Sequence, residues 1–142
     1  MDPIQQRLKD AGLRATRHRI AVLEALEALG RPVSHPEILR EIAHTRIDRV
    51  TLYRTLTSLS EVRLVHQVQG TDGVWRFCFH GTAESGCPGG HAHFLCEKCG
   101  MMVCLMGIRM PHIEVPDRYR VHHKQMLVTG LCPACAGTDA DT

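Results

Sequence analysis

The chain has 142 residues, 17 of them basic and 15 acidic, so its formal net charge is only +2. This length suits one domain or two small ones, and any surface for nucleic acid must be local because the overall charge is nearly balanced. The sequence opens without an apolar signal segment and has no apolar run of about 18 residues, which predicts a cytoplasmic protein without a membrane span. In that reducing compartment, the seven cysteines and ten histidines favour metal ligation over disulfides.

Short helices are expected in succession along the first part of the chain. Apolar residues recur at helical spacing within residues 4–11, and Thr16 is a suitable N-cap for a second helix. Residues 34–37 have the S-x-x-E pattern of a capping box, which opens a third helix. Asp48 can cap a fourth helix that runs from Arg49 to about Ser60.

The fourth helix is expected to have two different sides. One side is mostly apolar and should be buried: Leu52, Thr55, Leu56 and Leu59. The opposite side carries Val50, Tyr53, Arg54 and Thr57. Such a side can read a DNA groove, since tyrosine suits thymine methyls or sugars and arginine suits guanine edges or phosphates. An ordinary solvent-exposed helix face is the alternative interpretation.

Two β-rich segments follow, residues 64–68 and 74–79, and the turn-forming stretch Gly70–Gly73 joins them. Helices closed by a β-hairpin are typical of a winged helix-turn-helix, in which the fourth helix enters the major groove and the hairpin forms the wing. Residues 1–80 are therefore predicted to form this DNA-binding fold. Its basic residues are expected on the DNA face: Arg14, Arg17, Arg19, Arg49 and Arg54.

The second half of the chain starts with residues 81–90, which are small, polar and glycine-rich and therefore resemble a linker. Short strands are expected beyond it, at residues 91–93, 101–105 and 119–128. Pro111 and Pro116 argue against a long helix between the last two of these strands. Residues 138–142 are expected to be a frayed tail.

Two Cys-x-x-Cys pairs are the strongest chemical signal in the sequence. Four thiolates can surround one Zn²⁺ tetrahedrally, and a spacer of two residues lets one tight turn present both sulfurs of a pair. Two unrelated redox or core pairs are the alternative. We predict a structural zinc site at Cys96, Cys99, Cys132 and Cys135.

A second, mixed metal site is predicted from the remaining cysteines and from nearby histidines. The candidate ligands are Cys78, Cys87, Cys104, His66, His91 and His93. A set that contains thiolates favours Zn²⁺ over Mg²⁺, Ca²⁺ or Mn²⁺. Ligands from both sides of the linker would connect metal occupancy to the relative angle of the two halves, which is how a switch works. Each of these residues alone is more often a packing or surface residue than a ligand.

The order of these motifs resembles the ferric uptake regulator (Fur) superfamily of bacterial metal-responsive repressors. Residues 50–56, VTLYRTL, are close to the family's TVYRxL recognition-helix signature. Residues 91–100, HAHFLCEKCG, resemble its HxHxxCxxCG block, and residues 130–135, GLCPAC, resemble its closing GxCxxC. Residues 11–19 are similar to its AGLRxTxxR opening.

The resemblance implies an α+β protein with a winged helix-turn-helix over residues 1–80, a hinge at 81–90 and a small α/β dimerisation and metal-binding domain at 91–137. It implies a structural zinc on the four paired cysteines and a regulatory divalent ion at the hinge. It also implies a homodimer that binds A·T-rich palindromic operators and represses metal-uptake genes. The DNA contacts would come from Arg17, Arg19, Thr51, Tyr53, Arg54 and Thr57.

Zinc uptake regulators are the branch that the sequence most resembles. Their sensor site takes a histidine at the position of His66, a cysteine at Cys78 and a histidine from the His91/His93 block. The carboxylate usual in that site is replaced here by Cys104, and this softer set favours Zn²⁺ over Fe²⁺. Family members usually place a long helix between the positions of Cys104 and Val121. Pro111 and Pro116 argue against that helix here, which predicts an altered dimer interface.

Three other functions compete with this interpretation. An iron- or peroxide-responsive regulator of the same superfamily and a zinc-ribbon adaptor without metal-switched DNA binding remain alternatives. An enzyme is not expected, because zinc deaminases need H-x-E and P-C-x-x-C motifs. Here His91-Ala92-His93 has no glutamate, Leu131 precedes Cys132, and a site closed by four cysteines leaves no position for water.

Overall fold

The structure is a computed structural model that describes residues 2–79, 91–109, 111–121 and 124–139 of the chain. The chain divides into two compact units, Met1–Cys87 (unit 1) and Pro88–Thr142 (unit 2), and each is described by itself. The predicted linker at residues 81–90, which includes Cys87, lies entirely outside the described residues. None of the described helices is long and apolar enough to cross a membrane.

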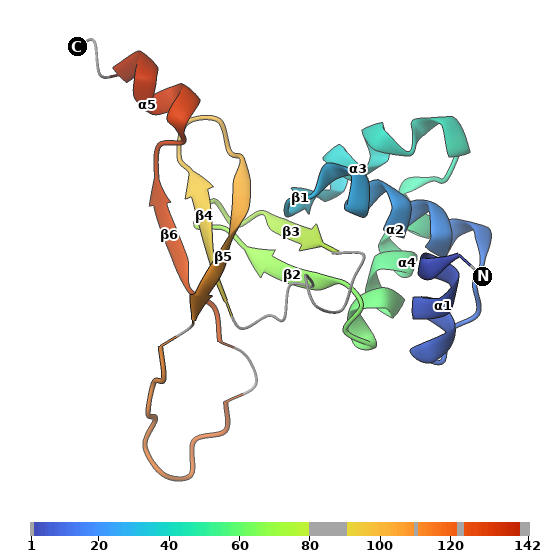
Figure 1. The fold of residues 1–142 in the computed structure, drawn as a ribbon, viewed down its shortest axis with the longest axis horizontal. Coiled ribbons are helices and arrows are strands. Elements are labelled where there is room, and N and C mark those ends of the chain that lie inside the picture. The colour runs from blue at the N-terminus through green and yellow to red at the C-terminus, as the bar shows by residue number, and fades with distance from the viewer. Residues whose placement is uncertain (1, 80–90, 110, 122–123, 140–142) are drawn as a thin grey trace. The chain divides into compact units, whose positions relative to one another are not determined.

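Unit 1 combines helices with a small antiparallel sheet (Figure 1). Its helices are α1 (Pro3–Asp10), α2 (Arg17–Leu29), α3 (His35–Glu41), the 3-10 turn η1 (Ala43–Thr45) and α4 (Arg49–Glu61). Its strands are β1 (Val33–Ser34), β2 (His66–Gln69) and β3 (Trp75–Cys78), in the order β1-β3-β2. The helices and the β2–β3 hairpin agree with the predicted winged helix-turn-helix, while β1 was not anticipated.

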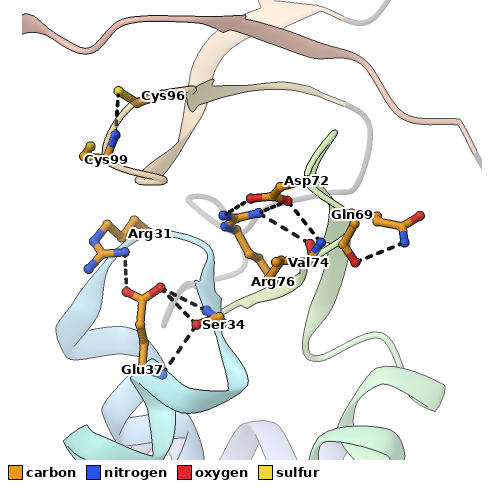
Figure 2. A network of polar contacts seen from close by, with 10 residues as sticks. Arg31, Ser34, Glu37, Gln69, Asp72, Val74, Arg76, Cys96 and Cys99 are labelled. Atoms are coloured by element: carbon orange, nitrogen blue, oxygen red, sulfur yellow. Dashed lines mark hydrogen bonds and ion pairs between the residues drawn. The ribbon is translucent and has the colours of Figure 1, made fainter. Parts of the chain in front are cut away.

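The predicted capping residues begin the helices of unit 1. The Thr16 hydroxyl accepts a hydrogen bond from the Arg19 backbone N–H at 3.3 Å, and Asp48 accepts one from the Thr51 N–H at 2.7 Å. Ser34 and Glu37 form the reciprocal capping box of α3, and Figure 2 shows these contacts. The helix starts are therefore determined by local side-chain chemistry, because each cap satisfies a backbone donor that the helix leaves unpaired.

The core of unit 1 lies between its helices. Leu8 of α1, Leu23 and Leu26 of α2, and Leu52 and Leu59 of α4 are completely buried. The predicted apolar side of α4 is thus the buried one. Because this side is buried, the opposite side of α4 faces solvent. That opposite side carries the residues predicted to contact DNA.

Unit 2 is built on a three-stranded sheet of β4 (His91–Cys96), β5 (Met102–Arg109) and β6 (Leu127–Gly130), with β4 in the centre. β5 is antiparallel to β4, and β6 is parallel to it (Figure 1). A short helix, α5 (Pro133–Asp139), follows β6. The two units together confirm the predicted α+β fold class.

Three expectations for unit 2 differ from the structure. The strand predicted at residues 119–128 corresponds to β6, which begins only at Leu127. β6 is this short because it pairs only with residues His93–Cys96 of β4. Helix α5 was not predicted, although Pro133 is favourable at a first helical position, where no backbone N–H is needed. α5 continues through Asp139, two residues into the predicted tail, and residues 140–142 lie outside the described ones.

The segment that contains the two prolines has no helix in its described part. Residues 111–121 are fully irregular and exposed, as the prolines predict. Ile113 and Tyr119 are 57% and 69% exposed, so this segment contributes little to the core of unit 2.

Candidate metal centres and nucleic-acid interface

The two cysteine pairs of unit 2 lie on two different local structures. Cys96 ends β4, and residues 97–99 form the turn that leads to β5. Gly100 closes this turn with a φ of 78°, a conformation in which a residue with a Cβ is strained. Cys132 immediately precedes α5 and Cys135 lies within its first turn. A strand end and a helix start therefore present the four sulfurs.

The four sulfurs gather in one place. Each lies within 4.8 Å of the others, and the sulfurs of Cys99 and Cys132 are 3.8 Å apart. A tetrahedron with Zn–S distances of about 2.3 Å has edges of about 3.8 Å. The donor set and its spacing therefore fit a tetrahedral Zn²⁺. Cys96, Cys99, Cys132 and Cys135 are brought together as the sequence analysis expected.

Backbone hydrogen bonds orient the Cys96 sulfur. It accepts from the backbone N–H of Cys99 at 3.5 Å, drawn in Figure 2, and from that of Cys132 at 3.4 Å. These N–H groups stabilise the thiolate and lower the pKa of Cys96 to about 6. The pKa of Cys135 is instead raised to about 12, chiefly by its hydrogen bond to Cys132 and by burial. The Cys96 sulfur is thus prepared as an anion, whereas a bound cation is needed to hold Cys135 as a thiolate.

Close contact between β6 and β4 brings the second cysteine pair to the first. The Glu97 N–H donates to the Gly130 carbonyl at 2.7 Å, and a Cβ at Gly130 would lie 3.4 Å from the Phe94 ring. Since 3.4 Å is an ordinary contact distance, the backbone pairing of β6 with β4, and not the lack of a side chain at Gly130, sets this approach.

The residues predicted to bind a regulatory ion form one pair of neighbours in each unit. In unit 1, His66 of β2 lies directly opposite Cys78 of β3. In unit 2, His93 of β4 lies opposite Cys104 of β5, and a ring nitrogen and the sulfur of this pair are within 4.8 Å. Cys78 and His93 are buried, with 1% and 3% of their surface exposed. Pairing places a nitrogen and a sulfur donor side by side in each sheet.

Two further candidate ligands have no described side chain. Cys87 lies outside the described residues, and only the backbone of His91 is described. The β4–β5 register shifts between His91 and His93, where a step of two residues in β4 lies opposite the five-residue step from Cys104 to Arg109 in β5.

The side of α4 predicted to contact DNA is exposed. Tyr53 and Val50 are 66% and 56% exposed, and Arg54 and Thr57 are exposed as well. Thr51 is half-buried, and its backbone N–H is used by the Asp48 cap. An aromatic ring, a guanidinium and a hydroxyl therefore lie on one accessible helix face.

The other residues predicted to contact DNA are basic and lie at the start of α2. Arg17 is exposed, and the half-buried Arg19 donates a hydrogen bond to the Arg14 carbonyl at 2.9 Å. The nearby carboxylate, that of Asp48, has its pKa lowered by hydrogen bonds from Thr51 and by the fields of neighbouring cations. It therefore remains ionised as a helix cap.

A groove between the hairpin and α4 was missed by the sequence analysis. It has a volume of about 770 Å³, and Tyr53, Arg49, His35 and Trp75 are among its lining residues. Trp75 is 48% exposed, whereas its neighbour Arg76 is 4% exposed and is paired with Asp72 (Figure 2). No sequence signal identified Trp75 as an outward residue, because alternation along this strand would be expected to expose the charged Arg76 and bury the aromatic ring.

Comparisons with known proteins agree with this architecture. Residues 10–129 match the Ferric uptake regulator family. The chain is 30% identical to the transcriptional regulator FurA of Mycobacterium tuberculosis, with 94% of this chain and 90% of that protein covered. It is 27% identical to the peroxide-responsive repressor PerR of Staphylococcus epidermidis, with 90% and 85% covered.

The fold is also similar to that of a zinc uptake regulator solved in complex with zinc and DNA. The TM-score is 0.66 at 21% sequence identity, with 96% of this chain and 92% of that chain covered. The match over most of the sequence and the likeness of the fold lead to one conclusion: the chain belongs to the ferric uptake regulator family.

Proposed function

We propose that this protein is a metal-responsive transcriptional repressor that binds DNA as a cytoplasmic homodimer and controls metal-uptake genes. A structural Zn²⁺ is held by the four paired cysteines, and a second divalent ion regulates DNA binding. Tyr53, Arg54, Thr51 and Thr57 of α4 contact an A·T-rich palindromic operator, and Arg17 and Arg19 lie near its phosphates. Family membership and relatives that are named transcriptional regulators or repressors support this proposal.

Zinc is the regulatory ion that we propose, and the observation that carries this choice is the chemistry of the two donor pairs. Each pair combines an imidazole with a thiol: His66 with Cys78, and His93 with Cys104. Two nitrogens and two sulfurs form a complete tetrahedral set for Zn²⁺. Since each pair supplies only two donors, the proposal requires both pairs, with His91 as a further candidate.

Iron or peroxide sensing is the second candidate function, because the sequence relatives include FurA and PerR. Iron sites of the non-haem kind use histidine with carboxylate, whereas thiolates select softer ions. Among the described candidates, the set contains Cys78 and Cys104 and no carboxylate, which favours zinc.

The proposal is tested by a titration of DNA binding with metal. Duplexes are first selected from a random pool by the zinc-loaded protein, and their affinity is then measured by fluorescence anisotropy over buffered Zn²⁺, Fe²⁺ and Mn²⁺. We expect affinity to rise at the lowest free concentration for Zn²⁺. A rise in DNA affinity with Fe²⁺ alone would establish the iron-responsive alternative. DNA affinity that does not change with any of the ions would show that no metal regulates binding.

The same assay tests the role of α4. Tyr53→Ala removes an exposed ring that packs in no core, so it should weaken binding to the selected duplex by about tenfold, or about 1.4 kcal/mol, while zinc content stays unchanged. Glu61→Ala, at the far end of the same helix, is the matched control and should bind normally. Normal binding by Tyr53→Ala would show that α4 does not contact DNA through this face.

A further inference from the structure

The exposed apolar residues of unit 1 are concentrated in one place. Among its described residues, the large apolar side chains that are more than a third exposed are Val50, Tyr53, Val74 and Trp75. All four line the groove between α4 and the β2–β3 hairpin. Grouped exposed apolar side chains indicate a binding surface, whereas single ones need no explanation.

The hairpin holds Trp75 in a defined position. Two hydrogen bonds join the Arg76 guanidinium to the Asp72 carboxylate, at 2.9 and 3.2 Å, and Asp72 also accepts from the Val74 N–H at 3.0 Å. Figure 2 shows this cluster at the turn. Because successive residues of a strand point to opposite faces, fixing Arg76 on one face presents Trp75 on the other. Trp75 is thus a rigid ring at the groove wall.

The polar residues of the groove suit an anionic partner. Arg49 lines it, and the buried Nε2 of His35 has no hydrogen-bond partner among the described residues. Gln67 and Thr57 add neutral donors, and no carboxylate is among the described lining residues. A sugar–phosphate strand is complementary to such a groove. Its deoxyribose faces can pack on the apolar side chains, and its charged phosphate oxygens can accept from the cationic and neutral donors.

We propose that this groove receives one sugar–phosphate strand of the DNA, with the Trp75 ring packed on a deoxyribose and Arg49 paired with a phosphate. The inference rests on the proposed function, since a helix in the major groove places the flanking strand between that helix and the wing. Trp75 then contributes affinity and positioning but no sequence preference, because every nucleotide has the same sugar.

The test uses the full-length, zinc-loaded protein and two duplexes of equal length, one selected by the wild type and one with its base order shuffled. Trp75 is the single tryptophan of the chain, so its fluorescence reports the contact directly. We expect both duplexes to change this emission. Trp75→Ala should weaken binding to both by a similar factor of about ten, equivalent to about 1.4 kcal/mol.

The salt dependence of DNA affinity distinguishes the contribution of Trp75 from that of Arg49. Trp75→Ala should leave the slope of log affinity against log salt unchanged, because it removes no phosphate contact. Arg49→Gln should reduce the magnitude of that slope by about 0.9, the effect of losing one phosphate contact. Arg63→Gln is the matched control for Arg49→Gln, because Arg63 is exposed, follows the far end of α4 and does not line the groove.

Several outcomes would overturn the inference. Wild-type binding with unchanged tryptophan emission and normal affinity of Trp75→Ala would reject it while leaving the proposed function in place. Loss of affinity only for the selected duplex would show base readout instead of a sugar contact. A Trp75→Ala variant that binds DNA normally but no longer forms dimers would show that a second copy of the chain occupies the groove. No DNA binding by the wild type under any metal would reject both proposals.

Discussion

At the scale of single residues, Cys96 connects the two cysteine pairs. Its sulfur accepts two backbone N–H groups, from Cys99 and Cys132, which belong to the two different cysteine pairs. It is 1% exposed and ends the central strand of unit 2. One side chain thus connects both halves of the four-sulfur cluster, and an ion bound there would stabilise the fold through that connection.

Cys96→Ser should therefore lose the structural zinc and much of the folded structure of unit 2, because the serine oxygen is a poor ligand for Zn²⁺ beside three thiolates. Zinc per chain by elemental analysis and thermal unfolding by circular dichroism measure the two effects. Cys104→Ser is the control, since Cys104 lies outside the four-sulfur cluster, and it should keep the structural zinc. If Cys96→Ser kept as much zinc as Cys104→Ser after treatment with a zinc chelator, and unfolded at the same temperature, the four sulfurs would not hold the structural ion.

Glu37 gives a prediction that depends on pH. Burial alone would raise the pKa of this carboxyl, but hydrogen bonds from Ser34 and the Arg31 ion pair at 2.9 Å hold it below its usual value. A lowered native pKa means that the ionised group stabilises the fold above the unfolded pKa of about 4.3, and that this contribution disappears as the pH falls through the native pKa.

Urea unfolding of the wild type and of Glu37→Gln should therefore differ at pH 7 and converge below about pH 4. The comparison at each pH is between two proteins with the same zinc ligands, so loss of metal in acid affects both equally. A difference that stayed constant down to pH 3 would show that the charge of Glu37 contributes nothing.

At the scale of elements, the start of α3 is determined by the capping box. Ser34 accepts from the Glu37 N–H at 3.5 Å, and Glu37 accepts from the Ser34 N–H at 3.3 Å. Because α3 has only seven residues, its terminal groups are a large part of its hydrogen bonding. Ile38 on the same helix is completely buried, so α3 must be held in place for the core of unit 1 to close.

Ser34→Ala should lower the free energy of unfolding by about 1 kcal/mol, the usual effect of removing a serine N-cap. Equilibrium urea denaturation followed by helical circular dichroism measures this change, with Ser34→Asp as the variant that keeps an N-cap acceptor. If alanine and aspartate had the same stability, the cap would not contribute to α3.

At the scale of the whole molecule, the proposed sensor depends on donors from both units. Each unit offers one histidine and one cysteine on adjacent strands, which is half of a tetrahedral set. A ligand whose affinity differs between two arrangements of a protein shifts the population towards the arrangement it binds better. Zinc would act in this way if both pairs join at one ion.

Cys78→Ser should consequently give a folded protein that keeps its structural zinc and loses the response of DNA binding to zinc. Cys104→Ser should behave in the same way, because it removes the other sulfur of the same set. Elemental analysis before and after treatment with a zinc chelator should find two populations in the wild type and only the resistant one in each variant. If Cys78→Ser responded normally while Cys104→Ser did not, the two pairs would not share an ion.

The sequence by itself determined the features that depend on neighbouring residues. Thr16, Ser34 and Asp48 fixed the helix starts because a cap acts within three positions, and apolar spacing identified the buried side of α4. The Cys-x-x-Cys pairs were equally local, since a two-residue spacer is sufficient to aim two sulfurs together.

Only the tertiary structure decided the features that depend on pairing between distant segments. The start of β6 is set by the short part of β4 that it pairs with, and strand register alone places His66 beside Cys78 and His93 beside Cys104. The outward position of Trp75 likewise required the β2–β3 register and the Arg76–Asp72 contact. These arrangements could not be read from the chain because the exact register, and with it the residues that lie side by side, is set only when two strands meet.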